Sequence, residues 1–215
     1  MTLTRTADGS LHITPSGQPD QLIVILHGVG SSAAAMQPLA EALTSGLPTA
    51  AIVAVNGYDP FDLGGTGRQW FSVKGVTDAN RAERVAEAMP RIEALLTTEE
   101  QRVGVTRQQT VLVGFSQGAI MGLHLAASSA EPPRAVIGLS GRVARPLRAG
   151  EGPRPPVLLS HGVADPVIPV SELDVAAAAL TEAGCHVETQ TIPGLGHTVD
   201  PRQIDRILDF IRTIP

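Results

Sequence analysis

The sequence of 215 residues predicts an α/β fold, in which helices cover both faces of a mainly parallel central sheet. Short apolar runs alternate with longer helical patterns from residue 20 onward, which is the order expected of right-handed βαβ units. The runs are apolar throughout rather than alternating with polar residues, as in strands that are buried on both faces. A single α/β domain commonly has this length, so one domain over residues 1–215 is predicted.

Six apolar runs are predicted strands. Leu22 to Leu26 is continuous and rich in β-branched residues, which favours a strand. The other five runs cover residues 50–55, 110–115, 135–139, 157–160 and 187–192. Residues 11–14 are a candidate for an additional strand at the edge of the sheet.

Five helices are predicted, over residues 33–45, 79–97, 117–129, 171–183 and 201–213. The last one has a clear start, because Asp200 is a good N-cap and Pro201 suits the first helical position. Asn80 is the expected N-cap of the second helix, with Glu83 at the spacing of a capping box. Pro90 conflicts with this helix and is expected to kink it or divide it in two, since proline removes a backbone hydrogen bond.

Composition argues against several classes of protein. The formal charge of −5 and the dispersed basic residues argue against nucleic acid as a partner, because phosphate binding needs clustered Lys and Arg. No stretch reaches about 18 consecutive apolar residues, so no membrane span is expected. The first ten residues lack the apolar core of a signal peptide, and a cytoplasmic location is therefore predicted. Cys185 is the single cysteine and is expected to be a small buried thiol.

The segment Gly114-Phe115-Ser116-Gln117-Gly118 lies between a predicted strand and a predicted helix. This position is typical of a nucleophile elbow, a sharp turn that presents its serine at the end of a strand. A Cβ at either glycine is expected to collide with the neighbouring strand or helix. Ser116 is therefore the predicted nucleophile. Its hydroxyl barely ionises at neutral pH, so it needs an adjacent base.

His197 is the predicted base. It lies in a loop after the last strand and just before the final helix. The other five histidines are explained by edge or surface positions, by packing or by structural hydrogen bonds. The elbow architecture requires an acid between the serine and the histidine in chain order. Asp165 follows a strand end and fits this order. Asp174 also lies between them, but helix capping already accounts for it. The acid would hold the imidazole in one tautomer and stabilise its protonated form.

Two backbone N–H groups are predicted to form an oxyanion hole. One belongs to Gln117, which directly follows the nucleophile at the positive end of its helix. The second is expected in the loop after an early strand, where the sequence is Leu26-His27-Gly28-Val29-Gly30. Its glycines let the backbone approach a ligand closely, and the N–H of Val29 is the candidate donor.

These segments together resemble the small phospholipase/carboxylesterase family of α/β-hydrolases, which includes the acyl-protein thioesterases. Residues 26–30 look like the LHGxG oxyanion segment of the family, and residues 114–119 are close to its GFSQGG or GFSQGA elbow. Residues 161–169 resemble its HGxxDxxVP acid loop, Gly196-His197 its terminal GH, and residues 68–71 its tryptophan segment. The chain departs from the family after the oxyanion segment, where Ser31-Ser32-Ala33 replaces a usual aspartate and glycine.

The resemblance implies an α/β-hydrolase fold. It implies a serine hydrolase that cleaves carboxylic esters or thioesters through an acyl-serine intermediate. It gives the triad roles to Ser116, Asp165 and His197, and the oxyanion roles to Val29 and Gln117. The chain has little room for a large inserted lid, which predicts an open site for short to medium acyl chains. Four residues near the predicted rim are expected to line an apolar slot for the acyl group: Leu63, Trp70, Phe71 and Ile168. In the alternative, Trp70 and Phe71 only anchor the 56–76 loop.

No cofactor or metal is expected, because the histidine and carboxylate spacings match no metal-binding motif. The expected partner is a small-molecule ester or thioester. A homodimer would be unsurprising, although no interface pattern stands out. Two other functions remain open: an acyl transferase or peptidase-like hydrolase on the same scaffold, and a non-catalytic protein that holds a small ligand in the pocket.

Overall fold

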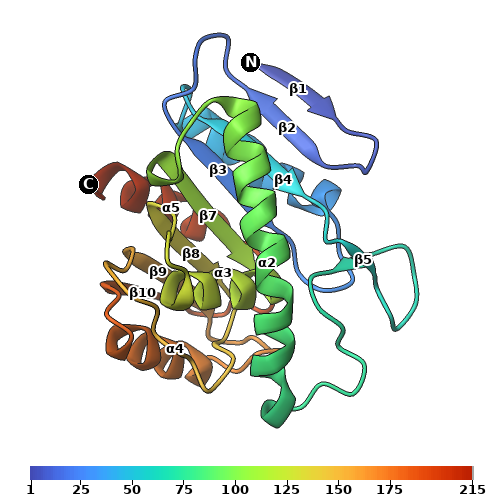
Figure 1. The fold of residues 1–215 in the computed structure, drawn as a ribbon, viewed down its shortest axis with the longest axis vertical. Helices are drawn as coiled ribbons and strands as arrows, with labels where there is room; N and C mark the ends of the chain where they lie inside the picture. Colours follow the sequence, from blue (N-terminus) through green and yellow to red (C-terminus); the bar gives the residue numbers. More distant parts are fainter. Residues whose placement is uncertain (215) are drawn as a thin grey trace.

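A computed structural model describes residues 1–214 (Figure 1). Its main sheet has eight strands in the order β1-β2-β4-β3-β7-β8-β9-β10. Their bounds are β1 Thr2–Arg5, β2 Leu11–Thr14, β3 Leu22–Leu26, β4 Ala51–Val55, β7 Thr110–Phe115, β8 Ala135–Leu139, β9 Val157–Gly162 and β10 Val187–Ile192. Six strands pair in parallel, in the order β4, β3, β7, β8, β9 and β10. The strands β1 and β2 are antiparallel and lie beside β4 at one end of the sheet. The predicted α/β fold with a mainly parallel sheet is confirmed.

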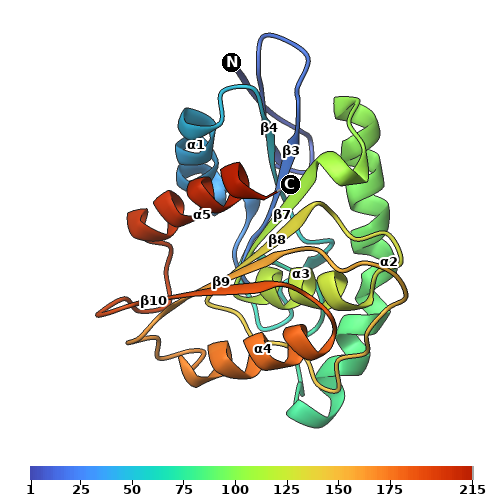
Figure 2. The ribbon, with the colours of Figure 1, turned by 90° about the vertical axis from the view of Figure 1, so that its left-hand side faces the viewer.

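Helices cover both faces of this sheet (Figure 2). On one face lie α1 (Gln37–Gly46), with the short 3-10 helix η1 (Ala33–Met36) before it, and α5 (Pro201–Thr213). On the other face lie α2 (Asp78–Val103), α3 (Gln117–Ser128) and α4 (Ser171–Glu182); a further 3-10 helix, η2 (Arg107–Gln109), precedes β7. Within the described chain, no helix is both long and apolar enough to cross a membrane.

Each face of the sheet has its own apolar core, because successive strand side chains point to opposite faces. In β3, Ile23 and Ile25 pack with the α1 and α5 side, whereas Val24 and Leu26 pack with the α2, α3 and α4 side. Cys185 is buried in this second core, as predicted, and burial raises the pKa of its thiol to about 11.

Three strands were not predicted from the sequence. All four residues of β1 are exposed, so this edge strand has no apolar pattern to reveal it. The strands β5 (Asp59–Pro60) and β6 (Arg68–Gln69) form a separate antiparallel hairpin of two residues each. Residues 11–14 do form a strand, β2, but its predicted place at the edge is wrong, because β2 pairs with β1 on one side and β4 on the other.

The helix α2 differs from its prediction in its start and its continuity. Thr77 is its N-cap, and Thr77 and Asn80 form a reciprocal capping box, so Asn80 is the third helical residue rather than the cap. Pro90 lies inside one helix of 26 residues, so the expected division is wrong. Proline has no N–H, so the carbonyl of Ala86, four residues earlier, receives no helical hydrogen bond from Pro90. Both residues are exposed, and this carbonyl can bind water instead.

The strand register brings distant loops together at one edge of the sheet. Leu26 lies opposite Gly114, Phe115 opposite Leu139, and Ile192 opposite Gly162. The segments that follow β3, β7, β9 and β10 therefore emerge side by side at the carboxyl ends of the strands. Parallel α/β sheets bind their ligands at this edge.

Candidate active site

Ser116 occupies a strained turn between β7 and α3. Its φ is 54° and its ψ is −114°, a backbone conformation that residues with a side chain rarely adopt. A Cβ at Gly114 would collide with the carbonyl of Gly118, and a Cβ at Gly118 with the carbonyl of Leu26. Both glycines are therefore needed for the strand, the turn and the helix to pack this closely. The predicted strand, turn and helix are all present.

The structure brings the three residues of the predicted triad into one hydrogen-bonded line. His197 Nε2 lies 2.9 Å from Ser116 Oγ, and His197 Nδ1 lies 2.7 Å from Asp165 Oδ2. The other oxygen of Asp165, Oδ1, accepts the backbone N–H groups of Val167 and Ile168 at 2.8 and 2.9 Å. With Asp165 accepting at Nδ1, the neutral imidazole has its lone pair on Nε2, facing the serine hydroxyl.

Asp165 is held in its charged form. Burial raises the pKa of its carboxyl, but the hydrogen bonds from His197 and from the N–H groups of Ile168 and Val167 outweigh this effect. The pKa of Asp165 therefore lies below its ordinary value. Its side chain is fully shielded from solvent, whereas that of His197 is 16% exposed. A buried carboxylate at this place stabilises positive charge on the imidazole.

Two further side chains surround the line. His161 is buried, with Nε2 2.9 Å from the carbonyl oxygen of Ile168 and 3.4 Å from Asp165 Oδ2. The ring of Phe115 packs on the ring of His197, with centroids 4.9 Å apart. The sequence pattern predicted neither contact. Phe115 and His197 are far apart along the chain, so only the folded structure shows that they meet.

The loop after β3 presents the backbone of Val29 near Ser116. A Cβ at Gly28 would lie 3.2 Å from the Cβ of Ser116, so the loop passes close to the serine. His27 accepts the N–H of Gly57 at Nε2, which leaves the Nδ1 proton to donate to the carbonyl of Gly28 at 2.7 Å. Burial lowers the pKa of His27 and so favours this neutral form.

These bonds orient the peptide between Gly28 and Val29. The carbonyl of Gly28 also accepts the N–H of Ser31. Since the C=O and N–H of a trans peptide point in opposite directions, the N–H of Val29 faces away from His27. Across residues 1–214 this N–H has no hydrogen-bond partner, and Gln117, as the first residue of α3, has no acceptor inside its helix. Both predicted donors are thus available to a ligand.

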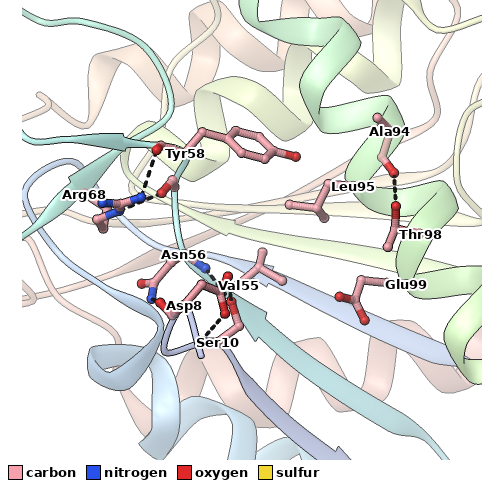
Figure 3. Close-up of a pocket in the computed structure, with 11 residues that line it drawn as sticks. Asp8, Ser10, Val55, Asn56, Tyr58, Arg68, Ala94, Leu95, Thr98 and Glu99 are labelled. Carbon is pink, nitrogen blue, oxygen red and sulfur yellow. Dashed lines mark hydrogen bonds between the residues drawn. The ribbon is translucent and has the colours of Figure 1, made fainter. Parts of the chain in front are cut away.

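The β5–β6 hairpin is joined to the same loop. The N–H of Gly30 donates to the carbonyl of Arg68, and the N–H of Arg68 donates to Ser31. The guanidinium of Arg68 donates to the carbonyls of Gly57 and Tyr58 (Figure 3). Arg68 thereby holds the hairpin against the loop that contains Val29.

A hollow of about 440 Å³ lies beside this hairpin. Figure 3 shows Asn56 and Arg68 on one side of it and the α2 residues Leu95 and Glu99 on the other. None of the predicted triad residues lines it. Asn56 Nδ2 donates to the carbonyl of Asp8, and Ser10 Oγ donates to the Asp8 carboxylate. Its polar groups are thus paired within the chain, and the triad edge remains the candidate site.

The side chain of Gln117 clamps the segment after β6. Its Oε1 accepts the N–H of Trp70 at 2.9 Å and its Nε2 donates to the carbonyl of Phe71 at 2.8 Å. Trp70 Nε1 in turn donates to the carbonyl of His27 at 2.8 Å. These buried bonds connect the elbow, the tryptophan segment and the loop after β3. In the sequence Gln117 indicated only a backbone donor, and the role of its side chain was missed.

The four residues predicted to line an acyl slot lie in different surroundings. Leu63, near the tip of the β5–β6 hairpin, is 64% exposed. Trp70 and Phe71 are 1% and 6% exposed, with the contacts expected of residues that anchor the loop. Ile168 is 5% exposed, and its N–H and carbonyl bind Asp165 and His161. The acyl-lining role of all four stays a prediction.

We expect Gln117→Met to destabilise the protein. Methionine has nearly the same length, but it leaves the buried N–H of Trp70 and carbonyl of Phe71 without partners, at about 1–3 kcal/mol for each group. Urea unfolding measures the change in the free energy of unfolding. The matched control is Gln101→Met on the exposed face of α2, which we expect to change it by less than about 0.5 kcal/mol. Equal effects of the two substitutions would contradict the clamp.

Metal ligands are not gathered in the described part of the chain. Between residues 1 and 214, no three or more His, Cys, Asp or Glu side chains are arranged to hold a metal ion.

Comparison of the sequence with known proteins identifies the family of this chain. The sequence profile of the phospholipase/carboxylesterase family matches residues 9–214. The chain belongs to this family. Esterase YpfH of Escherichia coli (strain K12) is 38% identical to it over 205 residues, which are 94% of this chain and 87% of that protein. Acyl-protein thioesterase 1 homolog 1 of Dictyostelium discoideum is 27% identical over 212 residues, covering 90% of each chain.

Solved structures agree with this assignment. The crystal structure of esterase PE8 has a TM-score of 0.86 at 29% identity, and the match covers 100% of both chains. The carboxylesterase of Bacillus cereus has a TM-score of 0.81 at 17% identity, which shows a common fold. This phospholipase/carboxylesterase family member has the α/β-hydrolase fold and is a carboxylesterase-type hydrolase. The family resemblance stated from the sequence is confirmed.

Proposed function

We propose that this protein is a serine hydrolase that cleaves carboxylic esters or thioesters of short to medium acyl chains through an acyl-serine intermediate. One observation carries the proposal: the line of hydrogen bonds from Ser116 through His197 to Asp165, with distances of 2.9 and 2.7 Å. A line of this kind is what serine nucleophiles use on unrelated folds. One domain over residues 1–215 is part of the proposal.

In the proposed mechanism, Ser116 Oγ attacks the carbonyl carbon of the substrate while His197 Nε2 accepts the serine proton. The carbonyl oxygen becomes an oxyanion and is stabilised by the N–H groups of Val29 and Gln117. The tetrahedral intermediate collapses as His197 gives the proton to the leaving alcohol or thiol. His197 then takes a proton from water, which attacks the acyl-serine. The second tetrahedral intermediate collapses as His197 returns this proton to Ser116 Oγ, and the acid is released.

Asp165 has a constant role in both halves of the reaction. Its carboxylate accepts a hydrogen bond from the N–H at His197 Nδ1, which keeps Nε2 free to act as the base. Its negative charge stabilises the imidazolium that forms each time His197 accepts a proton. The two backbone N–H groups at Oδ1 hold the carboxylate in place, so little rearrangement is needed during turnover.

The predicted acyl length is tested by measuring kcat/KM over p-nitrophenyl esters from acetate to palmitate, together with matching thioesters. We expect the maximum among short and medium chains, with Leu63 at the hairpin tip as a candidate contact. A strong preference for the longest chains would contradict the proposal. Transfer of the acyl group to an added alcohol or amine in preference to water would favour the alternative, an acyl transferase.

A non-catalytic binding protein is the second alternative. The presence of all three triad residues within hydrogen-bonding distance argues against it. The cytoplasmic location and a homodimer stay predictions from the sequence.

A further inference from the structure

An apolar cleft opens beside the candidate active site. It has a volume of about 350 Å³ and lies between the η1–α1 segment and the start of α5, which are neighbours on one face of the sheet (Figure 2). Phe115 and His197 are both part of its wall. One residue of the elbow and the proposed base therefore border the cleft directly.

The lining of the cleft favours an uncharged, apolar occupant. From η1 and α1 come Ala35, Met36 and Leu39, and from α5 comes Ile204. Among the residues that line it, His197 is the only one that can carry a charge. Apolar chains gain free energy in such a cleft in proportion to the surface they remove from water. A charged group would find no partner there.

The position of His197 decides which part of a substrate the cleft can receive. In the proposed mechanism the carbonyl oxygen points to the N–H groups of Val29 and Gln117. The leaving atom must point to His197 Nε2 instead, because that atom supplies its proton. The chain attached to the leaving atom therefore extends past the imidazole. The cleft borders the imidazole, and so lies on the side of the leaving group.

We propose that this cleft binds the apolar chain of the leaving alcohol or thiol, so that the enzyme selects its substrates by the leaving group as well as by the acyl group. This inference rests on the proposed function. Ala35 lines the cleft with a small, exposed side chain, so it leaves the space open for a ligand.

The test compares two series of simple esters. In one series the acid is acetate and the alcohol grows from methanol to hexanol; in the other the alcohol is methanol and the acid grows from acetate to hexanoate. With the wild type, kcat/KM in the alcohol series should rise by about fourfold for each methylene that the cleft buries. We expect Ala35→Trp to fill the cleft and to lower the ratio of hexyl to methyl acetate at least tenfold, while the acyl series keeps its trend.

Ala34→Trp is the matched control, because Ala34 is the neighbouring residue of η1, is also exposed and does not line the cleft. It should leave both series unchanged. Ile204→Trp blocks the cleft from the opposite wall, and circular dichroism verifies that each variant is folded. A flat alcohol series with the wild type, or a trend that survives both blocking variants, overturns the proposal. If the blocking variants abolish the trend of the acyl series and leave that of the alcohol series intact, the cleft binds the acyl chain and the proposal is overturned.

The same measurements distinguish an error in the proposed serine mechanism from an error in the assignment of the cleft. If methyl acetate is hydrolysed equally well by the wild type and by Ser116→Ala, the serine mechanism itself is wrong. If that hydrolysis needs Ser116 but the alcohol series is flat, the mechanism stands and only the assignment of the cleft is wrong.

Discussion

Replacing Ser116 by alanine should lower kcat for p-nitrophenyl acetate by about 10⁴- to 10⁶-fold, because no other group in the site can form the acyl intermediate. The N–H groups of Val29 and Gln117 would still bind the carbonyl oxygen, so a small residual rate above that in water is expected. KM should change little, since the hydroxyl contributes mainly to the transition state. Initial rates at saturating substrate measure the loss.

The matched control is Ser128→Ala. Ser128 lies at the other end of α3, where its Oγ donates to the carbonyl of His124. This substitution should leave kcat within about twofold of the wild type and should leave labelling by a fluorophosphonate intact. Ser116→Ala should not be labelled. Labelling of Ser116→Ala at the wild-type level, or activity within tenfold of the wild type, would mean that Ser116 is not the nucleophile.

Asp165→Asn should lower kcat by about 10⁴-fold while the protein remains folded. The reason lies in the hydrogen bonds of the carboxylate. The N–H groups of Val167 and Ile168 require an oxygen at Oδ1, so the amide nitrogen of the substituted side chain must face His197 Nδ1. That nitrogen donates, and His197 would then have to accept at Nδ1 and carry its proton on Nε2. In this tautomer it cannot accept the proton of Ser116.

Asp174→Asn is the control for this prediction. Asp174 also lies between the serine and the histidine in chain order, but the structure places it exposed in the first turn of α4. The substitution Asp174→Asn should leave kcat within about twofold of the wild type. Measuring both variants with the same ester decides between the two carboxylates. A large loss in Asp174→Asn together with wild-type activity in Asp165→Asn would reverse the assignment.

Much of the sheet could be predicted because its strands have a simple pattern. All five residues of β3, of β4 and of β8 are buried, since both faces of the sheet are covered by helices. Continuous apolar runs follow directly from that covering. The missed strands β1, β5 and β6 lie at an edge or in a short hairpin, where burial imposes no such pattern. Pro90 was misjudged because its orientation toward solvent depends on how α2 packs.

The candidate triad was also accessible from the sequence, because each member follows a strand and the elbow has a local signature. The glycines around Ser116 have steric reasons: a Cβ at Gly114 would meet the backbone of the turn itself, and a Cβ at Gly118 would meet Leu26 of the neighbouring strand. The chain order of the serine, acid and histidine then follows from the order of the parallel strands. His197 and Ser116 are 81 residues apart in the sequence, yet the pattern of strand ends was enough to select the pair.

The residues of the candidate site were thus selected from the sequence, since a proposed nucleophile, base and acid can be chosen by residue type and by position at strand ends. The clamp of Gln117 on Trp70 and Phe71 is different, because it joins segments 47 and 46 residues apart. The contact of Phe115 with His197 and the cleft beside them likewise depend on how α1, α5 and two loops pack. Short-range patterns determine which elements form, whereas the directions of individual side chains are set by the close packing of elements distant in the chain.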